Sequence, residues 1–323
     1  MITEFLTILA GVIVILALAQ IIIKNSISLA KHYGLSGTFV GLTILSIGTS
    51  IPEIMTHIIG SINIVRHPET INTLSGLLIG TNIGSDIFQQ NFVLPIIGII
   101  GTIIVIRKNL FVEMGGLIAA SVLVWVLSLG GLLTRLEGLI LLVAYIAYLI
   151  YLKQSNVSEN IGAENNLSKK GIVWAISLVS VCFIIMGFVT DRVVDAATII
   201  VEHLSISASF FGIIMLGVAS ALPELTTSFI AIMKGKKELS AGILIGSNIT
   251  NPLFGIGIGA LISTYKVPNV AVFYDLPVKI ITAFLLLYFL LRNEKLNKWE
   301  AVVLITLFIV YLIVRQIYFP VDF

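Results

Sequence analysis

The sequence predicts an all-α polytopic membrane protein, with ten transmembrane helices arranged as two inverted five-helix repeats. Three observations support this prediction: a low charged fraction, apolar runs of bilayer length, and a motif that occurs twice. Of the 323 residues, 11% are charged and 58% are hydrophobic, and the mean hydropathy is +1.08. Soluble domains carry about 25% charged residues. The composition therefore excludes a cytosolic enzyme, a nucleic-acid-binding protein and a disordered chain.

Apolar runs of about 20 residues cross a bilayer as helices. We expect ten such spans, at residues 5–23, 38–62, 74–104, 110–130, 136–152, 171–190, 206–233, 240–264, 272–291 and 299–317. The runs lack the alternation of a membrane β-barrel, so the class is helical. The one long polar connection, 154–170, separates a first repeat (1–153) from a second (171–323).

Basic residues are distributed unequally between the two sides of the predicted membrane topology. When the connections alternate between the sides, one side receives 13 of the 19 basic residues. Cytoplasmic connections are enriched in Lys and Arg. Segment 154–170 is therefore predicted to be a cytoplasmic linker, both termini are predicted to be extracellular, and the location is the cell membrane.

An internal repeat relates the two halves. GLTILSIGTSIPEIMTHII (41–59) aligns with GIIMLGVASALPELTTSFI (212–230), and GLLIGTNIGSDIF (76–88) aligns with GILIGSNITNPLF (242–254). Each half has five predicted crossings, an odd number, so the second half starts on the opposite side and the repeats are inverted. Inverted repeats are typical of alternating-access transporters, whose substrate site lies near the bilayer midplane on broken helices.

Glu53 and Glu224 occupy equivalent positions in the repeats, near the middle of their spans. A carboxylate at this depth is costly and usually functional. The two-fold axis brings both together, and two carboxylates in a dry site stay ionised only when a cation joins them. The alternative is a pair of hydrogen-bonded glutamic acids that holds helices together.

Pro52 and Pro223 directly precede the glutamates. A proline inside a helix removes one donor and clashes with the carbonyl four residues earlier. We therefore expect a helix break at each proline, which leaves carbonyl oxygens available to a cation.

Hydroxyl and amide side chains surround both glutamates in the sequence. They are Ser46, Thr49, Ser50, Thr81, Asn82 and Ser85 in the first half, and Ser220, Ser247, Asn248 and Asn251 in the second. Hard oxygen ligands of this kind suit Ca²⁺ and Na⁺. A packing role for small residues is the alternative for each single Ser or Thr.

Two further polar residues, His57 and Asp86, lie outside this set of oxygen donors. His57 lies one turn after Glu53, and we expect it to form a hydrogen bond between helices, with a proton relay as the alternative. Asp86 has Pro252 as its repeat partner. We expect Asp86 to be a charge of the outer vestibule rather than a site carboxylate.

GTSIPE (48–53), ASALPE (219–224) and the paired IGTN and IGSN segments (79–82, 245–248) resemble the α-repeats of the sodium/calcium exchanger family, part of the calcium/cation antiporter superfamily. The resemblance covers the whole chain. It implies that Glu53 and Glu224 bind Ca²⁺ at the centre and that Thr49 and Ser220 contribute backbone oxygens. It implies that Na⁺ uses flanking positions, which are lined by Ser50, Thr81, Ser247 and the carbonyls of Ser46 and Gly217.

The chain departs from the family pattern at three positions. Ser85 and Asn251 stand where relatives usually carry Asn and then Asp or Asn, and Ala221 replaces a hydroxyl residue. We expect Ser85 and Asn251 to take the two cage positions. Asn251 resembles the potassium-independent branch of the superfamily more than the potassium-dependent one.

The predicted function is a secondary antiporter that exchanges Ca²⁺ for Na⁺. Exchange of Ca²⁺ or another divalent cation for H⁺ is the alternative within this class, and a cation channel is the alternative from another class. An intramembrane enzyme would need a nucleophile–base pair or a metal motif such as HExxH, and the four histidines form no such motif. We expect no resident cofactor, no nucleic-acid partner, membrane lipid as surroundings, and a functional monomer.

The first and sixth spans lack acids and prolines near their middles. We expect them to move against a core of the other eight spans, because the ligands of a small cation cannot part far during transport.

Overall fold

The computed structural model describes residues 2–32, 46–101, 107–154, 167–204, 206–233 and 237–322. Within these residues, nine helices are long and apolar enough to cross a membrane. They coincide with nine of the ten predicted spans, which confirms the all-α membrane class. The remaining predicted span, 38–62, lies partly outside the described residues, and its second half forms a helix.

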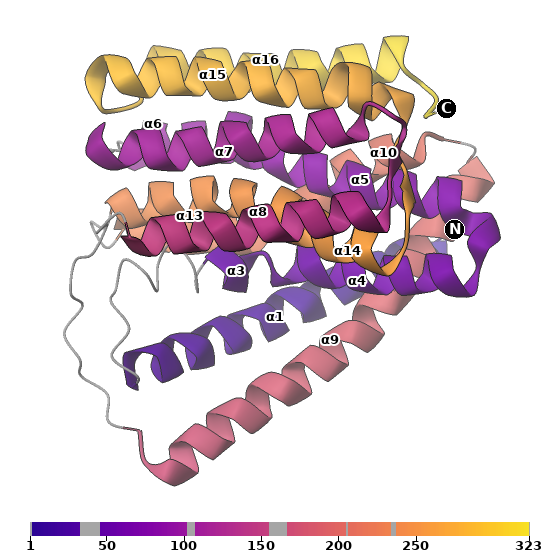
Figure 1. Ribbon diagram of the computed structural model, residues 1–323, viewed down its shortest axis with the longest axis horizontal. Helices are drawn as coiled ribbons and strands as arrows, with labels where there is room; N and C mark the ends of the chain where they lie inside the picture. The colour runs from indigo at the N-terminus through magenta and orange to yellow at the C-terminus, as the bar shows by residue number, and fades with distance from the viewer. Residues whose placement is uncertain are drawn as a thin grey trace.

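The first half of the chain is coloured from indigo to magenta in Figure 1. Its elements are α1 (Ile2–His32), α3 (Ser46–Thr49), α4 (Ile51–Arg66), η2 (Pro68–Thr70), α5 (Ile71–Phe88), η3 (Gln89–Val93), α6 (Leu94–Gly101), α7 (Arg107–Ser128), β1 (Leu132–Leu133) and α8 (Arg135–Gln154). The segment from η2 to α6 is one continuous membrane-spanning helix, since η3 is a π-helical turn inside it.

The second half of the chain contains the remaining elements. Its elements are α9 (Lys169–Leu204), α10 (Ala208–Phe211), η4 (Gly212–Gly217), α11 (Val218–Ser220), α12 (Leu222–Met233), α13 (Lys237–Thr250), η5 (Asn251–Ile256), α14 (Gly257–Ile262), β2 (Tyr265–Lys266), η6 (Ala271–Asp275), α15 (Leu276–Asn293) and α16 (Lys298–Tyr318). π-Helical turns such as η4 and η5 occur often at functional sites, because each one redirects the side chains that follow it.

The long helices lie in stacked layers (Figure 1). Helices α15 and α16 form one edge of the molecule, α1 and α9 form the opposite edge, and the broken helices lie between them. Both chain termini lie at the same end of the molecule. Strands β1 and β2 form a short antiparallel pair, with Leu132 opposite Lys266 and Leu133 opposite Tyr265.

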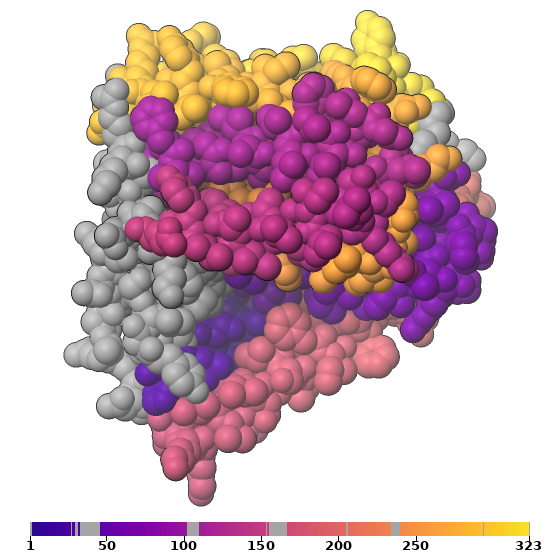
Figure 2. Space-filling view, viewed as in Figure 1, coloured from indigo at the N-terminus to yellow at the C-terminus, as the bar shows by residue number. Residues whose placement is uncertain are grey.

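Helices α1 and α9 pack against each other and form the edge that stands apart from the layers. Figure 2 shows α9 as a ridge along this flank. Its outward side chains are apolar: Val173, Trp174, Ile184 and Phe188 are each more than 60% exposed. Lipid is the environment that suits such a surface, because contact with water would cost about 25 cal/mol per Å² of apolar area.

Two of the six basic residues counted on the other side of the predicted topology, Lys279 and Arg315, fall within the predicted spans 272–291 and 299–317 and are buried. Lys279 lies within α15 and Arg315 within α16, and both are almost completely inaccessible to solvent. Arg315 pairs with Asp275 at 3.3 Å and with Asp322 at 3.4 Å. The count of basic residues by side treated them as charges in water, whereas a buried charge is stable inside the protein when an oppositely charged partner is present.

Candidate ion-binding site

A one-residue interruption between two helices lies two residues before each proline, at Ser50 and Ala221. Helix α3 ends at Thr49 and α4 begins at Ile51, while α11 ends at Ser220 and α12 begins at Leu222. Pro52 and Pro223 therefore occupy the second position of the new helix, where a missing N–H is tolerated. Glu53 and Glu224 follow in the first turn of α4 and α12.

The two breaks have the same local hydrogen bonds. Thr49 donates its hydroxyl to the Ser46 carbonyl at 3.2 Å, and Ser220 donates its hydroxyl to the Gly217 carbonyl at 3.2 Å. The amides of Ser50 and Ala221 donate to the same two carbonyls. The carbonyl oxygens of Ser46 and Gly217, which the family resemblance assigns to Na⁺, thus each accept two hydrogen bonds.

Close helix packing brings the four ligand-bearing spans together. Helix α5 packs on α10 and η4, and in return α4 packs on η5 and α14. A Cβ atom at Gly80 or Gly84 would overlap the backbone of Ser209 or Ile213, so glycine is required for this contact. At Gly217, a Cβ would lie 2.8 Å from the Ser85 nitrogen and from the Thr81 carbonyl oxygen.

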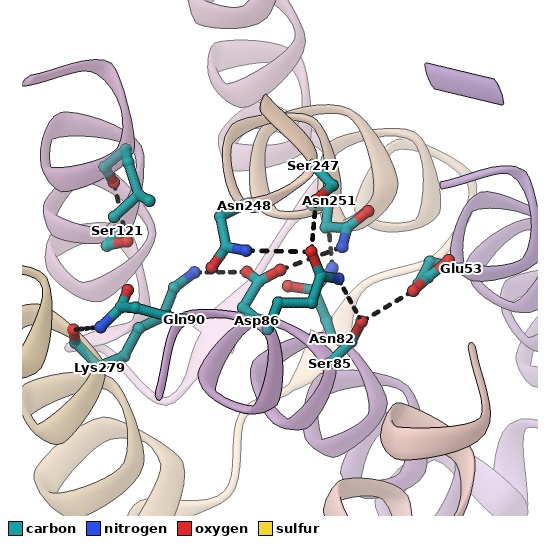
Figure 3. Close-up of polar contacts among 12 residues, drawn as sticks. Glu53, Asn82, Ser85, Asp86, Gln90, Ser121, Ser247, Asn248, Asn251 and Lys279 are labelled. Carbon is teal, nitrogen blue, oxygen red and sulfur yellow. Dashed lines mark hydrogen bonds and ion pairs between the residues drawn. The ribbon is translucent and has the colours of Figure 1, made fainter. Parts of the chain in front are cut away.

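Both carboxylates are completely buried and each receives a serine hydroxyl. Ser85 donates to Glu53 Oε1 at 2.8 Å, and Ser50 donates to Glu224 Oε1 at 3.4 Å. Figure 3 shows Ser85 and Glu53 facing each other across the site. Ser50 therefore connects the break of the first half to the glutamate of the second.

Several buried oxygens of this region have no hydrogen-bond partner among the described residues. They are Oε2 of Glu53 and Glu224 and Oδ1 of Asn82, Asn248 and Asn251. A buried hydrogen-bond acceptor without a partner costs free energy. All five atoms are also hard oxygen ligands for metal cations. A divalent or monovalent hard cation is the group that such oxygens bind.

The predicted flanking hydroxyls are buried as well. Thr81 donates to the Leu77 carbonyl at 2.7 Å. The Ser247 hydroxyl lies 3.1 Å from the Leu244 carbonyl oxygen, but its single proton goes to the closer acceptor, Gln89 Oε1. A hydroxyl that donates its proton in this way keeps its oxygen lone pairs for another partner.

Gln89 is a central residue that the sequence prediction missed. It donates to Ser85 at 3.0 Å, and its Oε1 accepts from Ser247 and, at 3.3 Å, from Asn248. The side chain thus joins α5 to α13. The sequence did offer one signal, a polar glutamine in an apolar span four residues after Ser85. Its partner in the repeat alignment is Gly255, so the repeat did not mark Gln89 as a site residue.

Asn82 and Asn248 are also part of the site. Asn82 donates to the Asn251 carbonyl oxygen at 2.8 Å, and its own Oδ1 is one of the unpartnered oxygens. Both are among the hard oxygen donors expected from the sequence, and the repeat alignment pairs them.

Asp86 lies at the site and not in an outer vestibule, so that expectation is wrong. It accepts a hydrogen bond from Asn251 Nδ2 at 3.0 Å and forms an ion pair with Lys279. Figure 3 shows this chain from Lys279 through Asp86 to Asn251. The sequence argument failed because the partner of Asp86 lies far away in the chain, on α15.

His57 forms the expected hydrogen bond between elements. Its Nδ1 lies 3.1 Å from the Tyr265 hydroxyl in β2, and its Nε2 lies 3.3 Å from Asn82 Nδ2. Since Nε2 accepts from an amide, the histidine is neutral with its proton on Nδ1. Burial raises the pKa of Tyr265, so its hydroxyl keeps its proton.

A small cavity of about 30 Å³ lies between α1, α9 and the broken helices. It is lined by Val12, Ile15, Leu16, Pro52, Thr56, Val193, Leu216, Ala219 and Ser220. Helices α1 and α9 contribute only apolar side chains to it, whereas Ser220 reaches it from the site. At this cavity, α1 and α9 therefore offer the site no hydrogen-bonding side chain.

Comparisons with known proteins agree with one another and with the resemblance seen in the repeat motifs. The family model described as sodium/calcium exchanger protein matches residues 3–153 and 174–316. The uncharacterized membrane protein MJ0091 of Methanocaldococcus jannaschii is 28% identical over 305 residues, which cover 94% of both chains. The sodium/calcium exchanger MaX1 of Methanosarcina acetivorans is 25% identical, covering 96% of this chain and 98% of that one. A solved structure of the sodium-calcium exchanger NCX_Mj matches with a TM-score of 0.65 and 26% identity, covering 96% of this chain and 97% of that chain.

Proposed function

Because the chain belongs to the sodium/calcium exchanger family, we propose that it is a secondary antiporter that exchanges Ca²⁺ for Na⁺ across the cell membrane. The observation that carries this proposal is the pair of buried glutamates, each with one carboxylate oxygen that has no partner among the described residues. Two carboxylates balance one Ca²⁺. Removal of that Ca²⁺ leaves two buried negative charges.

The charge balance makes the exchange obligatory. A buried carboxylate without a partner costs several kcal/mol, so the protein does not readily change sides with an empty site. Na⁺ ions at the same carboxylates restore the balance, and Ca²⁺ and Na⁺ therefore compete and move in opposite directions.

The central Ca²⁺ ligands in this proposal are Glu53, Glu224, the backbone oxygens of Thr49 and Ser220, and the side chains of Ser85 and Asn251. Ser85 already contacts Glu53, and Asn251 Oδ1 has no partner among the described residues. Na⁺ takes flanking positions beside Ser50, Thr81 and Ser247, with the carbonyls of Ser46 and Gly217, which the Thr49 and Ser220 hydroxyls release when the ion binds. The neighbouring amide oxygens of Asn82 and Asn248 support the same charge.

The larger organisation of the transporter is also a proposal. Residues 1–153 and 171–323 form two inverted repeats joined by a cytoplasmic linker, 154–170, and both termini face outward. The matching breaks at Ser50 and Ala221 support the repeat. The transporter works as a monomer in lipid and needs no resident cofactor, since the ions are its substrates.

Ca²⁺ uptake into proteoliposomes under imposed gradients tests the function. Vesicles loaded with Na⁺ and diluted into Na⁺-free medium are expected to accumulate ⁴⁵Ca²⁺, and vesicles loaded with K⁺ or with an acidic buffer are not. Uptake driven by a pH gradient without Na⁺ would instead establish proton exchange. Uptake down the Ca²⁺ gradient alone, with no counter-ion, would establish a channel.

A further inference from the structure

Lys279 and Asp86 form an ion pair at the edge of the ion site. Both side chains are at most 1% exposed, and they come from α15 and α5. Lys279 Nζ donates to Asp86 Oδ2. An ammonium group is a compact monovalent cation with three donors, so Lys279 supplies Asp86 with the charge that a bound ion would otherwise supply.

Asp86 connects this pair to the proposed ligands. Its Oδ1 accepts from Asn251 Nδ2 at 3.0 Å, which leaves Asn251 Oδ1 without a partner among the described residues. Asp86 also interacts electrostatically with Glu224. The region thus contains three carboxylates, Glu53, Glu224 and Asp86, and one ammonium group.

The charge balance depends on the lysine. With Ca²⁺ bound, the three carboxylates are neutralised by one divalent ion and one ammonium group. Without the ammonium group, the same site with Ca²⁺ keeps one uncompensated negative charge in a buried region, which costs several kcal/mol. A monovalent cation bound beside Asp86 would remove that charge.

We propose that Lys279 is a resident monovalent cation of the ion site, which occupies the place at Asp86 that a free Na⁺ or K⁺ would otherwise take. The assignment rests on the proposed exchange function, since it concerns the edge of the same site. It makes Lys279 a residue that determines specificity: the ammonium group excludes a free monovalent ion from Asp86 and keeps the Asn251 amide oriented.

Removal of the ammonium group tests the proposal. The melting temperatures of wild type and purified Lys279→Met are each measured when Na⁺ or K⁺ replaces N-methylglucamine at constant ionic strength. The rise in Lys279→Met is expected to exceed the rise in wild type by roughly 3 °C or more. Separate titrations with Na⁺ and K⁺ distinguish the two ions. The double variant Asp86→Asn/Lys279→Met removes both charges, and this extra stabilisation is expected to disappear.

Thr282→Val is the matched control, because Thr282 lies one turn after Lys279 and accepts from Gln90 at 2.7 Å and Asn91 at 3.0 Å. It disturbs the same helix without a change in charge and is expected to show the wild-type response to both ions. A cation response in Lys279→Met no larger than in this control would overturn the proposal. Failure of both Lys279→Met and Lys279→Gln to fold in high Na⁺ or K⁺ would also overturn it, since the free ion is expected to replace the ammonium group.

These measurements need no transport, so they separate the proposal from the proposed function. If wild-type vesicles exchange Ca²⁺ for Na⁺ while Lys279→Met gains no cation response, only the role of Lys279 is wrong. If Lys279→Met gains the cation response and wild-type vesicles show no exchange, the proposed role of Lys279 is supported and the proposed exchange function is wrong.

Discussion

The Ser50 hydroxyl donates to the Glu224 carboxylate at 3.4 Å, so the break in one half of the chain contacts the buried acid of the other half. The equivalent position in the second half is Ala221, which has no hydroxyl to offer Glu53. Glu53 instead receives its hydroxyl from Ser85 at 2.8 Å. The two acids are thus equivalent in the sequence but differ in their contacts.

This asymmetry predicts the effect of Ala221→Ser. The new hydroxyl supplies one more hard oxygen near Glu53, worth about 0.5–1.5 kcal/mol if it behaves like a typical hydrogen bond. We expect the Na⁺ concentration for half-maximal Ca²⁺ efflux from vesicles to fall by about two- to tenfold. Ser50→Ala is the matched variant and is expected to raise that concentration. An unchanged Na⁺ response in both variants would argue against a sodium site at these positions.

Glu53→Gln and Glu224→Gln are each expected to reduce Na⁺-driven Ca²⁺ uptake to the level of empty vesicles. An amide keeps the shape of the side chain but removes the charge that balances the ion. Both variants are expected to remain folded, because the amide oxygen still accepts from Ser85 or Ser50 and the cost of a buried charge is gone. Uptake is measured with ⁴⁵Ca²⁺ after size-exclusion chromatography has shown a single folded species. Near-normal uptake by both single variants would be incompatible with the proposed site.

The motion of α1 and α9 is tested by a cross-link between α9 and the core. Asn63 Nδ2 in α4 lies 3.0 Å from Asp191 Oδ1 in α9, so cysteines at these positions are within reach of a short bis-methanethiosulfonate, which forms a disulfide with each thiol that a reductant cleaves. In a Cys182→Ser background, the cross-linked Asn63→Cys/Asp191→Cys protein is expected to lose exchange, to keep ⁴⁵Ca²⁺ binding, and to recover after reduction. The two single-cysteine variants, treated in the same way, are the controls. Full exchange by the completely cross-linked protein would exclude a motion of α9 against α4.

Gly80→Ala is expected to lower the melting temperature by several degrees. Its Cβ would overlap the Ser209 backbone, and overpacking of this kind costs about 1–3 kcal/mol. Gly115→Ala on α7 is the control, because a Cβ there meets nothing within 4 Å and alanine favours the helix by up to about 1 kcal/mol. Equal melting temperatures for the two variants, measured in the same detergent, would show that the contact between α5 and α10 is not tight.

The helical class and the position of the two acids could be predicted because the information is local or repeated. Apolar runs of bilayer length require helices, since an unpaired backbone group is too costly in lipid. Pro52 and Pro223 break their helices through their own ring geometry. Glu53 and Glu224 were selected because each has a copy of itself at an equivalent position.

The contacts that differ between the two halves of the chain are decided by the tertiary structure alone. Gln89 and Asp86 face Gly255 and Pro252 in the alignment, so no internal copy marked them as functional. The sequence offered no partner for the charge of Lys279, because Asp86 is 193 residues away in the chain. The two side chains pair in the interior. A buried charge is stable only when its partner is present, and which partner reaches it is decided by how the helices pack.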